Sequence, residues 1–407
     1  MTPTTRLSRV LLYSHDTYGL GHLRRNLVIA TELLNGPRPP QVVLASGSPV
    51  IDQVPRPPGL ICVQLPPVVK TGDDEYRAID PTMSLSLVRR ARTAVLLDVV
   101  RRWTPDVLLV DHAPQGMKGE MLPVFDELPR VSPGTKVVLG MRDILDEPAR
   151  VQQAWRDAGV YETLTSAYDR ILVYGDRTVF DLVREYRIPP VVADRVEYCG
   201  YVTGDRTQLS VPPPGLPQGT DYVLGTIGGG GDGSELLVAA ARAAVRSGMA
   251  AVLCTGPLMA PSDRAWVVAA TRDLPSVVVV DHLREPVAVA AGARCVVTRG
   301  GYNSLCELVR GGVPTIVVPR TWPRREQQLR AEAFESRGLV CRVDEDGPDL
   351  EGRLADAIAS ATASTPSPAV HLDLDGRHRV VAALRRVAGE RTAPHADAVV
   401  EPAKVPA

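Results

Sequence analysis

The sequence predicts an α/β protein made of two Rossmann-like, doubly wound domains that face one another across a cleft. Three observations predict this fold class. The 407 residues are too many for one ordinary core and suit two domains of nearly equal size. Short apolar runs alternate with amphipathic stretches along the chain, and a proline- and glycine-rich segment near the middle interrupts both patterns.

The apolar runs are typical of buried parallel strands, because such strands are covered on both faces and read as continuous hydrophobic segments. In the first half the predicted strands are RVLLYS, QVVLAS, LICVQL, DVLLVD, KVVLGM and RILVYG. In the second half they are DYVLGTI, MAAVLC, SVVVVD, RCVVT, VPTIVVP and GLVCRV. The sequence between consecutive runs has room for a helix, which is the pattern of a doubly wound sheet.

The segment QLSVPPPGLPQGTD separates the two halves, because its prolines and glycines continue neither a helix nor a strand. We therefore expect an amino-terminal domain over 1–207, a linker over 208–220 and a carboxy-terminal domain over 221–389. Residues 390–407 lack any period and predict a disordered tail. Within the first domain, 66–81 and 141–148 are expected to be loops at strand ends.

Composition excludes several classes of function. The formal net charge is -1 and no long basic block is present, which argues against nucleic acid as a partner. The six cysteines are scattered without a C-x-x-C pair, so we expect reduced thiols, a cytoplasmic location and no metal site. No apolar stretch approaches the roughly 18 residues of a membrane span, so no integral membrane association is expected.

The first motif is YGLGHLRRNL, directly after the first predicted strand. Gly19 and Gly21 allow close approach of a ligand to a helix start, where free N–H groups favour anions. His22 is then expected at the edge of the cleft. Arg24 and Arg25 occupy the first turn against the dipole preference for acids, which indicates either a functional site or simply exposed arginines beside a glycine turn.

The second motif is LGTIGGGGDGSELL, after the first strand of the second half. Its glycines fit a G-x-G-x-x-G spacing, but a dinucleotide site requires Asp or Glu at the end of the next strand, and MAAVLCTG supplies none. We expect Gly228, Gly229 and Gly230 to let a phosphate or sugar approach the backbone. A flexible loop without a ligand is the alternative.

The third motif is VVTRGGYNSLCELVRGG, a strand that leads into a helix through two glycines. Free N–H groups at this helix start can bind a diphosphate. Asn303 and Glu307 are four residues apart and share a helix face, so the carboxylate can accept hydrogen bonds from both ribose hydroxyls. The alternative for Glu307 is a solvated helix acid. The residues expected at this donor site are Arg299, Gly300, Gly301, Tyr302, Asn303, Ser304 and Glu307.

The fourth motif is PRTWPRREQQLRAEAF, which follows the next strand. Glu326 and Gln327 together can hydrogen-bond several hydroxyls of a hexose, while Arg320 and Arg325 supply positive charge. A capped surface helix is the alternative. In the first domain, Asp111 with His112 and Arg142 with Asp143 follow two strands and are expected to line the cleft, where polar residues at strand ends gather, or to cap helices.

Taken together, these motifs resemble the two-domain GT-B glycosyltransferases and are similar to family 28, which includes the peptidoglycan N-acetylglucosaminyl transferase. RGGYNSLCELVRGGVPTIVVPR and REQQLRAEAF carry the closest likeness, and GLGHLRR, the glycine loop, VDHAP and MRDILDEP match a predicted-glycosyltransferase branch. The resemblance implies that Glu307 holds the ribose, 300–304 the diphosphate, and Glu326 with Gln327 the donor sugar. It also places His22 beside the reaction centre.

The function this implies is an inverting, metal-independent transfer of a hexose or N-acetylhexosamine from a nucleoside diphosphate sugar, UDP-linked, to an acceptor hydroxyl. His22 is expected to be the base, with Asp111 as second choice. Helix starts with Arg299, Arg320 or Arg325 would stabilise the leaving diphosphate, and no cofactor is expected. The alternatives are a nucleotide-sugar epimerase of the same fold and a non-catalytic nucleotide-sugar sensor.

Overall fold

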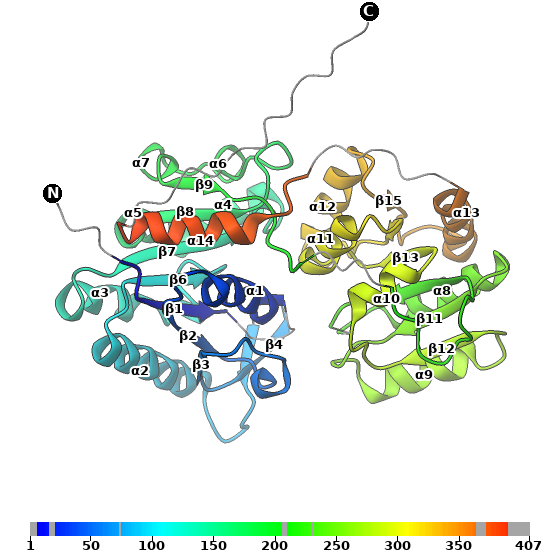
Figure 1. Ribbon diagram of the computed structural model, residues 1–407, viewed down its shortest axis with the longest axis horizontal. Coiled ribbons are helices and arrows are strands. Elements are labelled where there is room, and N and C mark those ends of the chain that lie inside the picture. The colour runs from blue at the N-terminus through cyan, green and yellow to red at the C-terminus, as the bar shows by residue number, and fades with distance from the viewer. Residues whose placement is uncertain are drawn as a thin grey trace, which may run out of the picture.

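The computed structural model describes residues 6–15, 21–72, 75–205, 210–229, 231–363 and 372–389. Two α/β lobes lie side by side, and each is built on its own parallel sheet (Figure 1). Every apolar run predicted above forms a strand in one of these two sheets. The predicted fold class, with two Rossmann-like domains, is therefore confirmed.

The first sheet has seven parallel strands in the order β3-β2-β1-β6-β7-β8-β9. Its strands are β1 (Arg9–Ser14), β2 (Gln41–Ser46), β3 (Leu60–Gln64), β6 (Val107–Asp111), β7 (Lys136–Arg142), β8 (Arg170–Tyr174) and β9 (Val196–Tyr198). The edge strand β9 was not predicted, because its three residues are only half-buried and form no apolar run.

Helices connect these strands on both faces of the sheet. They are α1 (Gly21–Asn35), α2 (Leu85–Trp103), α3 (Leu122–Val131), α4 (Pro148–Asp157), α5 (Val160–Ala167), α6 (Leu182–Glu185) and α7 (Pro190–Ala193), with short 3₁₀ turns at Ile51–Gln53 and Met117–Gly119. Helix α2 shows why they begin and end where they do. The Ser84 side chain accepts from the Leu87 N–H at its start, and Thr104 in left-handed conformation ends it.

The expectation that 66–81 is only a loop was wrong. Strands β4 (Val68–Gly72) and β5 (Glu75–Ala78) pair antiparallel as a separate hairpin. The buried side chains of Val68 and Ala78 pack with Met117, so one face of the hairpin is covered by the first domain. Turn residues in the middle of the segment masked two strands too short to show a period.

The second sheet has six parallel strands in the order β12-β11-β10-β13-β14-β15. They are β10 (Tyr222–Thr226), β11 (Ala250–Cys254), β12 (Val277–Val280), β13 (Cys295–Thr298), β14 (Thr315–Val317) and β15 (Cys341–Arg342). The helices of this lobe are α8 (Ser234–Arg246), α9 (Pro261–Thr271), α10 (Pro286–Gly292), α11 (Tyr302–Gly311), α12 (Glu326–Glu335) and α13 (Leu350–Ala363).

The last helix, α14 (Gly376–Val387), does not belong to the second domain as expected. It packs on α1 and β8 of the first sheet, as its position against the first lobe in Figure 1 shows. Its buried side chains Val380 and Leu384 join the cluster that contains Leu27 and Leu33 of α1. A stretch assigned by sequence order to 221–389 thus completes the core of the other lobe.

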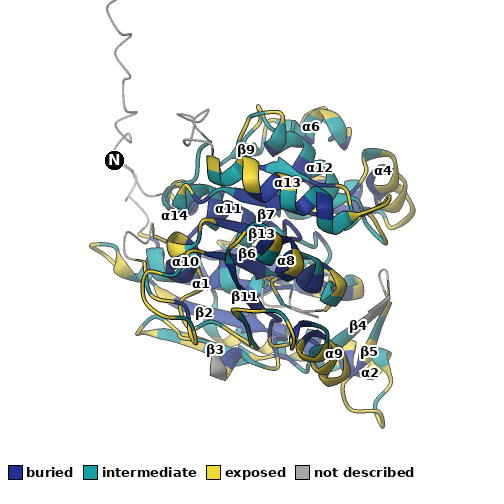
Figure 2. Ribbon diagram, turned by 90° about the vertical axis from the view of Figure 1, so that its right-hand side faces the viewer, coloured by how far each residue is buried: buried dark blue, intermediate teal, exposed yellow. Residues whose placement is uncertain are grey.

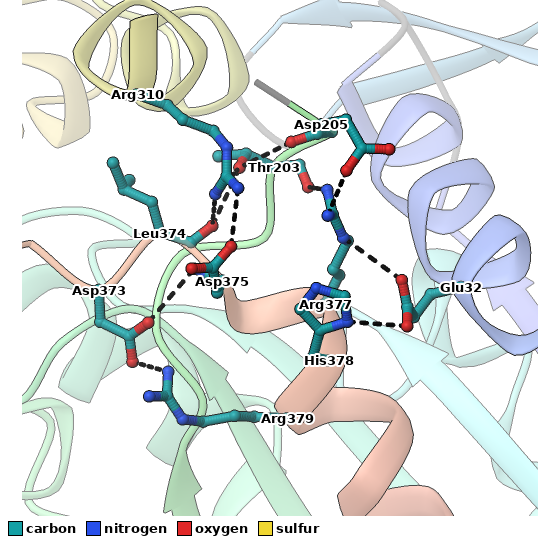
Figure 3. Close-up of polar contacts among 11 residues, drawn as sticks. Glu32, Thr203, Asp205, Arg310, Asp373, Leu374, Asp375, Arg377, His378 and Arg379 are labelled. Atoms are coloured by element: carbon teal, nitrogen blue, oxygen red, sulfur yellow. Dashed lines mark hydrogen bonds and ion pairs between the residues drawn. The ribbon is translucent and has the colours of Figure 1, made fainter. Parts of the chain in front are cut away.

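The chain therefore crosses between the lobes twice, at 202–205 and at 372–375, and the crossings pair through a bridge between Val202 and Asp375. Arg310 of α11 holds both of them. Its guanidinium donates to the Thr203 hydroxyl (3.2 Å), the Leu374 carbonyl (2.6 Å) and the Asp375 carboxylate (2.7 Å), as Figure 3 shows. These contacts tie the connection between the lobes to one helix of the second lobe.

Apolar packing continues from one lobe into the other. Tyr201 and Tyr302 pack with ring centroids 5.8 Å apart, and Phe334 of α12 meets Tyr201 edge-on at 5.6 Å. These three side chains are buried in the same cluster as the α1 and α14 residues. Figure 2 shows the inner strands of both sheets buried, such as β6 and β13, with much of the exposed surface on loops and on the outer faces of helices. The lobes are thus docked through a shared core.

None of the helices in the described part of the chain is long and apolar enough to cross a membrane. The predicted tail, 390–407, and the start of the predicted linker, 208–209, lie outside the described residues.

Candidate functional site

In the first lobe, the start of helix α1 and the carboxyl end of strand β8 contact the start of helix α11 in the second lobe. Among the polar contacts between them, the Asn303 side chain donates to the Gly21 carbonyl at 2.8 Å, and the Tyr302 hydroxyl donates to the Tyr174 carbonyl at 3.0 Å. A pocket of about 260 Å³ opens between α1 and α11, with Leu27, Val28 and Glu307 among its walls. The predicted cleft residues of the two halves therefore meet.

His22, in the first turn of α1, forms a hydrogen bond with Asp111 at the end of β6. Its Nδ1 lies 2.7 Å from Asp111 Oδ2, and 19% of the histidine side chain is exposed while none of the aspartate is. Because an ionised carboxylate only accepts, Nδ1 carries the proton and Nε2 is the basic nitrogen. This is the arrangement by which an aspartate orients a histidine base in hydrolytic triads.

Arg25 fixes Asp111 from the other side. Its guanidinium donates to Asp111 Oδ1 at 2.7 and 3.0 Å and to Oδ2 at 2.8 Å, and it lies over the rings of Tyr174 and Tyr302. Arg25 is 3% exposed and lies in the wall of the pocket between α1 and α11, where it holds Asp111 in place.

Burial alone would raise the pKa of Asp111, but the charges of Arg25 and His22 outweigh it and hold that pKa at about 2. A carboxylate with so low a pKa, and with both oxygens engaged, is a poor proton acceptor. We therefore assign Asp111, the second candidate for the base, to positioning His22.

Two further histidines surround His22. The ring centroid of His112 lies 4.8 Å from that of His22, and the buried His15 ring lies 5.7 Å from it. Burial, followed by the nearby positive charge of Arg142, lowers the pKa of His112 well below its ordinary value, so this ring is neutral. Arg142 Nη2 lies 3.5 Å from His112 Nε2. His112 and Arg142 thus both adjoin the base.

The start of α11 has the open backbone that the sequence predicted. Gly300 has φ 79°, and a Cβ there would come within 2.6 Å of the Val317 side chain, so only glycine fits. Gly301 precedes the first helical residue, and its carbonyl accepts from the Leu305 N–H. The N–H groups of Tyr302, Asn303 and Ser304 thus begin the helix without partners in the preceding turn.

The glycine loop after β10 reaches the same place. A Cβ at Gly228, which has φ 69°, would lie 4.0 Å from the Ser304 hydroxyl, and the Gly229 carbonyl accepts from the Leu258 N–H. The two glycine-rich turns of the second domain therefore adjoin. The predicted site residues Gly19 and Gly230 lie outside the described residues.

Glu307, the predicted ribose ligand, is occupied by a residue of the other lobe. Both of its oxygens accept from Arg24 Nη2, at 3.0 and 3.1 Å. Burial raises the pKa of Glu307, and the charge of Arg24 opposes this. Arg24 and Glu307 were each predicted to contact a ligand. In the structure they form an ion pair with each other, and this pair joins the two domains.

Three arginines predicted to supply charge to the diphosphate are engaged elsewhere. Arg299 is 8% exposed and pairs with Glu345 at 2.6 and 2.7 Å. Arg320 pairs with Asp232 at 3.2 Å. Arg325 turns to the first domain, where its N–H donates to Asp146 at 2.9 Å and its guanidinium to Glu147 at 3.3 Å. In the structure, all three guanidinium groups thus contact carboxylates of the protein.

Glu326 and Gln327 begin α12 at the edge of the cleft. Burial would raise the pKa of Glu326, but Arg142 and three other arginines lower it overall, so the carboxylate is ionised. Gln327 Oε1 accepts from the Arg320 N–H at 3.1 Å. Asp143, by contrast, is fully buried and accepts from the Tyr201 hydroxyl at 2.6 Å; its pKa is raised by burial. It braces the interface and does not line the cleft.

Local sequence pattern does not single out Arg330, which is fully buried between the lobes. Its Nη2 donates to the Ile144 carbonyl at 3.2 Å, and its guanidinium lies 5.6 Å from the centre of the Tyr302 ring. Arg330 follows Glu326 by four residues, a spacing that is typical of an ion pair on an exposed helix face. Its burial depends on a contact between distant segments, which local pattern does not encode.

No group of three or more His, Cys, Asp or Glu side chains in the described part of the chain is arranged to hold a metal ion.

Comparison with family models finds one match in the second half of the chain. Residues 258–369 match the model of the glycosyltransferase family 28 C-terminal domain. By sequence, none of the curated proteins matches the chain significantly.

Solved structures resemble the chain over nearly its whole length. The glycotransferase of kitacinnamycin is 18% identical, with a TM-score of 0.59 over 95% of this chain and 96% of its own. LpCGTa, solved in complex with UDP, is 14% identical, with a TM-score of 0.59 over 94% of each chain. A putative UDP-N-acetylglucosamine 2-epimerase from Listeria monocytogenes is 14% identical, with a TM-score of 0.61 over 93% of this chain and 95% of its own. The fold is the GT-B fold.

Proposed function

Because the chain has the GT-B fold and carries a glycosyltransferase family 28 C-terminal domain, we propose that it is an inverting glycosyltransferase. It moves a hexose or N-acetylhexosamine from a nucleoside diphosphate sugar to the hydroxyl of a small-molecule or glycan acceptor. UDP is the proposed nucleotide, in line with the UDP complex and the UDP-sugar epimerase among the similar structures. The reaction needs no metal, and the protein acts in the cytoplasm.

The observation that carries the proposal is the His22–Asp111 pair at the interface of the lobes. His22 Nε2 takes the proton of the acceptor hydroxyl while the hydroxyl oxygen attacks the anomeric carbon. The bond from that carbon to the diphosphate breaks, the diphosphate leaves with the electron pair, and attack from the opposite face inverts the configuration. Asp111 stabilises the imidazolium that forms, since its own pKa of about 2 keeps it ionised.

The donor lies along α11 in this proposal. Its diphosphate accepts hydrogen bonds from the free N–H groups at the helix start. Its ribose hydroxyls donate to the carboxylate of Glu307, one turn further along the helix. The ribose must then displace the Arg24 guanidinium from that carboxylate, to which it donates in the structure. Glu326 and Gln327 bind hydroxyls of the donor sugar.

Thermal-shift measurement with a panel of nucleoside diphosphate sugars tests the proposal, because a ligand that binds only the folded state raises the melting temperature. We expect UDP-N-acetylglucosamine or another UDP-sugar to stabilise the protein and mannitol, as an uncharged control, to leave it unchanged. If no nucleotide sugar stabilises the protein, the donor site is wrong.

A nucleotide-sugar epimerase is the second candidate, favoured by the likeness to the Listeria protein. In an epimerase the diphosphate leaves the same sugar to which it returns, so no acceptor is needed. Incubation with UDP-N-acetylglucosamine alone separates the two: a new sugar isomer in the NMR spectrum indicates the epimerase. If the donor stays unchanged on its own and is consumed when acceptors are added, the protein is a transferase. If the donor binds but is not converted under either condition, the protein is a sensor.

A further inference from the structure

The arginines around the site differ in whether they have a carboxylate partner. Arg24 contacts Glu307 and Arg25 contacts Asp111, each within 3.0 Å. The three arginines once expected at the diphosphate are also paired, with Glu345, Asp232 and Glu147. Their charges are compensated within the protein, so each would have to break an ion pair before it could bind an anion.

Arg142 is the exception at the centre of the site. It is half-buried at the end of β7, and among the described residues no carboxylate lies within the 4.0 Å of an ion pair. Its Nε is buried without an acceptor, and its only polar neighbour within 3.5 Å is the ring of His112. Burial lowers the pKa of Arg142 to about 10, so it still carries its charge at neutral pH.

Arg330, from the other lobe, is a second arginine for which no carboxylate among the described residues lies within the 4.0 Å of an ion pair. It is fully buried, and its Nε and Nη1 lack acceptors in the described part of the chain. The positive charge of Arg330 is among the causes that lower the pKa of Arg142, and the charge of Glu326 opposes this effect. Unpaired guanidinium groups are costly to bury, so their arrangement at an interface between lobes indicates an anion that is bound there.

We propose that Arg142 contacts the diphosphate of the donor, and that it is the residue which neutralises the negative charge that develops as the diphosphate leaves. This rests on the proposed transferase function. A guanidinium donates two parallel hydrogen bonds to phosphate, which makes arginine suited to this task. Arg142 follows β7 beside His112, itself packed against His22, so it places a positive charge at the reacting centre from the first lobe. Arg330 is a positioning residue that holds the Ile144 carbonyl, two residues beyond Arg142.

The test compares the affinities of UDP and uridine by calorimetry for the full chain and three variants. In Arg142→Ala we expect UDP to bind at least about tenfold more weakly, because a charge-assisted hydrogen bond to phosphate is lost, while uridine binding is unchanged. Arg142→Lys should recover part of the loss, since it keeps the charge but not the fork. Arg101→Ala is the matched control, because it removes the same charge from an exposed surface pair with Glu127.

The outcomes separate this inference from the function on which it rests. If UDP and the diphosphates of thymidine, guanosine, adenosine and cytidine all fail to bind the unmodified protein, the proposed function itself is wrong. If UDP binds the unmodified protein and Arg142→Ala equally, the inference about Arg142 is overturned alone. Equal weakening of UDP and uridine overturns it in favour of a purely structural role. A change only in the KM for the acceptor overturns it in favour of an anionic acceptor.

Discussion

At the scale of single residues, the site depends on which ring nitrogen of His22 carries the proton. Asp111 fixes the proton of His22 on Nδ1, which leaves Nε2 to act, and Arg25 keeps Asp111 ionised. His112 stays neutral beside them, so it does not place a second positive charge against the base.

Replacing His22 with alanine should lower kcat by about 10² to 10⁴, the usual contribution of a positioned general base. The affinity for UDP should change by less than about twofold, because the imidazole acts on the acceptor. Steady-state kinetics together with calorimetry check this split. A loss of UDP affinity equal to the loss of kcat would contradict the assignment of His22 as the base.

The pH dependence of stability should report Asp111. Its pKa in the folded protein is about 2, below the ordinary value of 3.8, so folding favours the ionised form. That contribution, about 2.5 kcal/mol for a shift of this size, is complete above about pH 4 and is lost as the pH falls toward 2. Denaturant unfolding between pH 5 and pH 2.5 should therefore fall more steeply for the unmodified protein than for Asp111→Asn. Parallel curves would show that Asp111 is not ionised by its partners.

Removing an arginine from a nucleotide site usually weakens nucleotide binding. For Arg24, the ion pair with Glu307 predicts the opposite effect. Removing the positive charge in Arg24→Ala should strengthen UDP binding, by up to about fivefold, because the nucleotide no longer competes with an ion pair whose partial exposure limits it to about 1 kcal/mol. Glu307→Ala should weaken UDP binding. Calorimetry on both variants measures this; weaker binding in Arg24→Ala would instead make Arg24 a nucleotide ligand.

At the scale of elements, helix α11 connects the proposed nucleotide site with the two crossings of the chain between the lobes. Asn303 and Glu307 face the first lobe, and Arg310, three residues further, holds both crossings of the chain (Figure 3). The first turn of this helix and the contacts that hold the two crossings therefore lie on the same element.

Arg310→Ala should destabilise the protein by about 2 kcal/mol, since hydrogen bonds to three groups on the crossings are lost and two involve a charged or buried partner. It should also widen the range of lobe orientations, which small-angle X-ray scattering measures as a larger radius of gyration without ligand. Arg246→Ala is the control, because it breaks an exposed pair with Glu351 at 3.6 Å and should change neither quantity.

Local sequence pattern was sufficient for elements that are buried on both faces. Strands such as β6 and β13 appear as uninterrupted apolar runs, and the start of α11 follows from its two glycines. The pattern failed for the β4–β5 hairpin and for β9, which are too short to show a period. It also could not find the Arg24–Glu307 pair, because the partners are separated by 283 residues and either one alone looks like a solvated helix residue.

At the scale of the whole molecule, the core of the first lobe depends on the end of the described chain. The buried side chains of α14 cover α1, and they come from a segment that follows the entire second lobe. The first lobe is therefore built from two separate stretches of sequence, and the second lobe is inserted between them.

A fragment of residues 1–205 should aggregate, because the apolar side of α1 that α14 covers would be exposed to solvent. Adding a peptide of residues 372–389 should raise its melting temperature and reduce its light scattering. The control peptide carries Leu384→Asp, which places a charge where the side chain is fully buried. If 1–205 is monomeric and equally stable with either peptide, α14 contributes nothing to this core.

The double crossing restricts how donor preference can be exchanged between relatives. A hybrid with a single splice near 206–221 would bring a foreign α14 onto a native α1, and the two surfaces would have to match by chance. A productive exchange needs two splices, one in each crossing, so that the inserted portion runs from about 210 to 372 and the ends stay together. The unit that can be exchanged is thus an insert within a host lobe, and the bridge between Val202 and Asp375 marks where it enters and leaves.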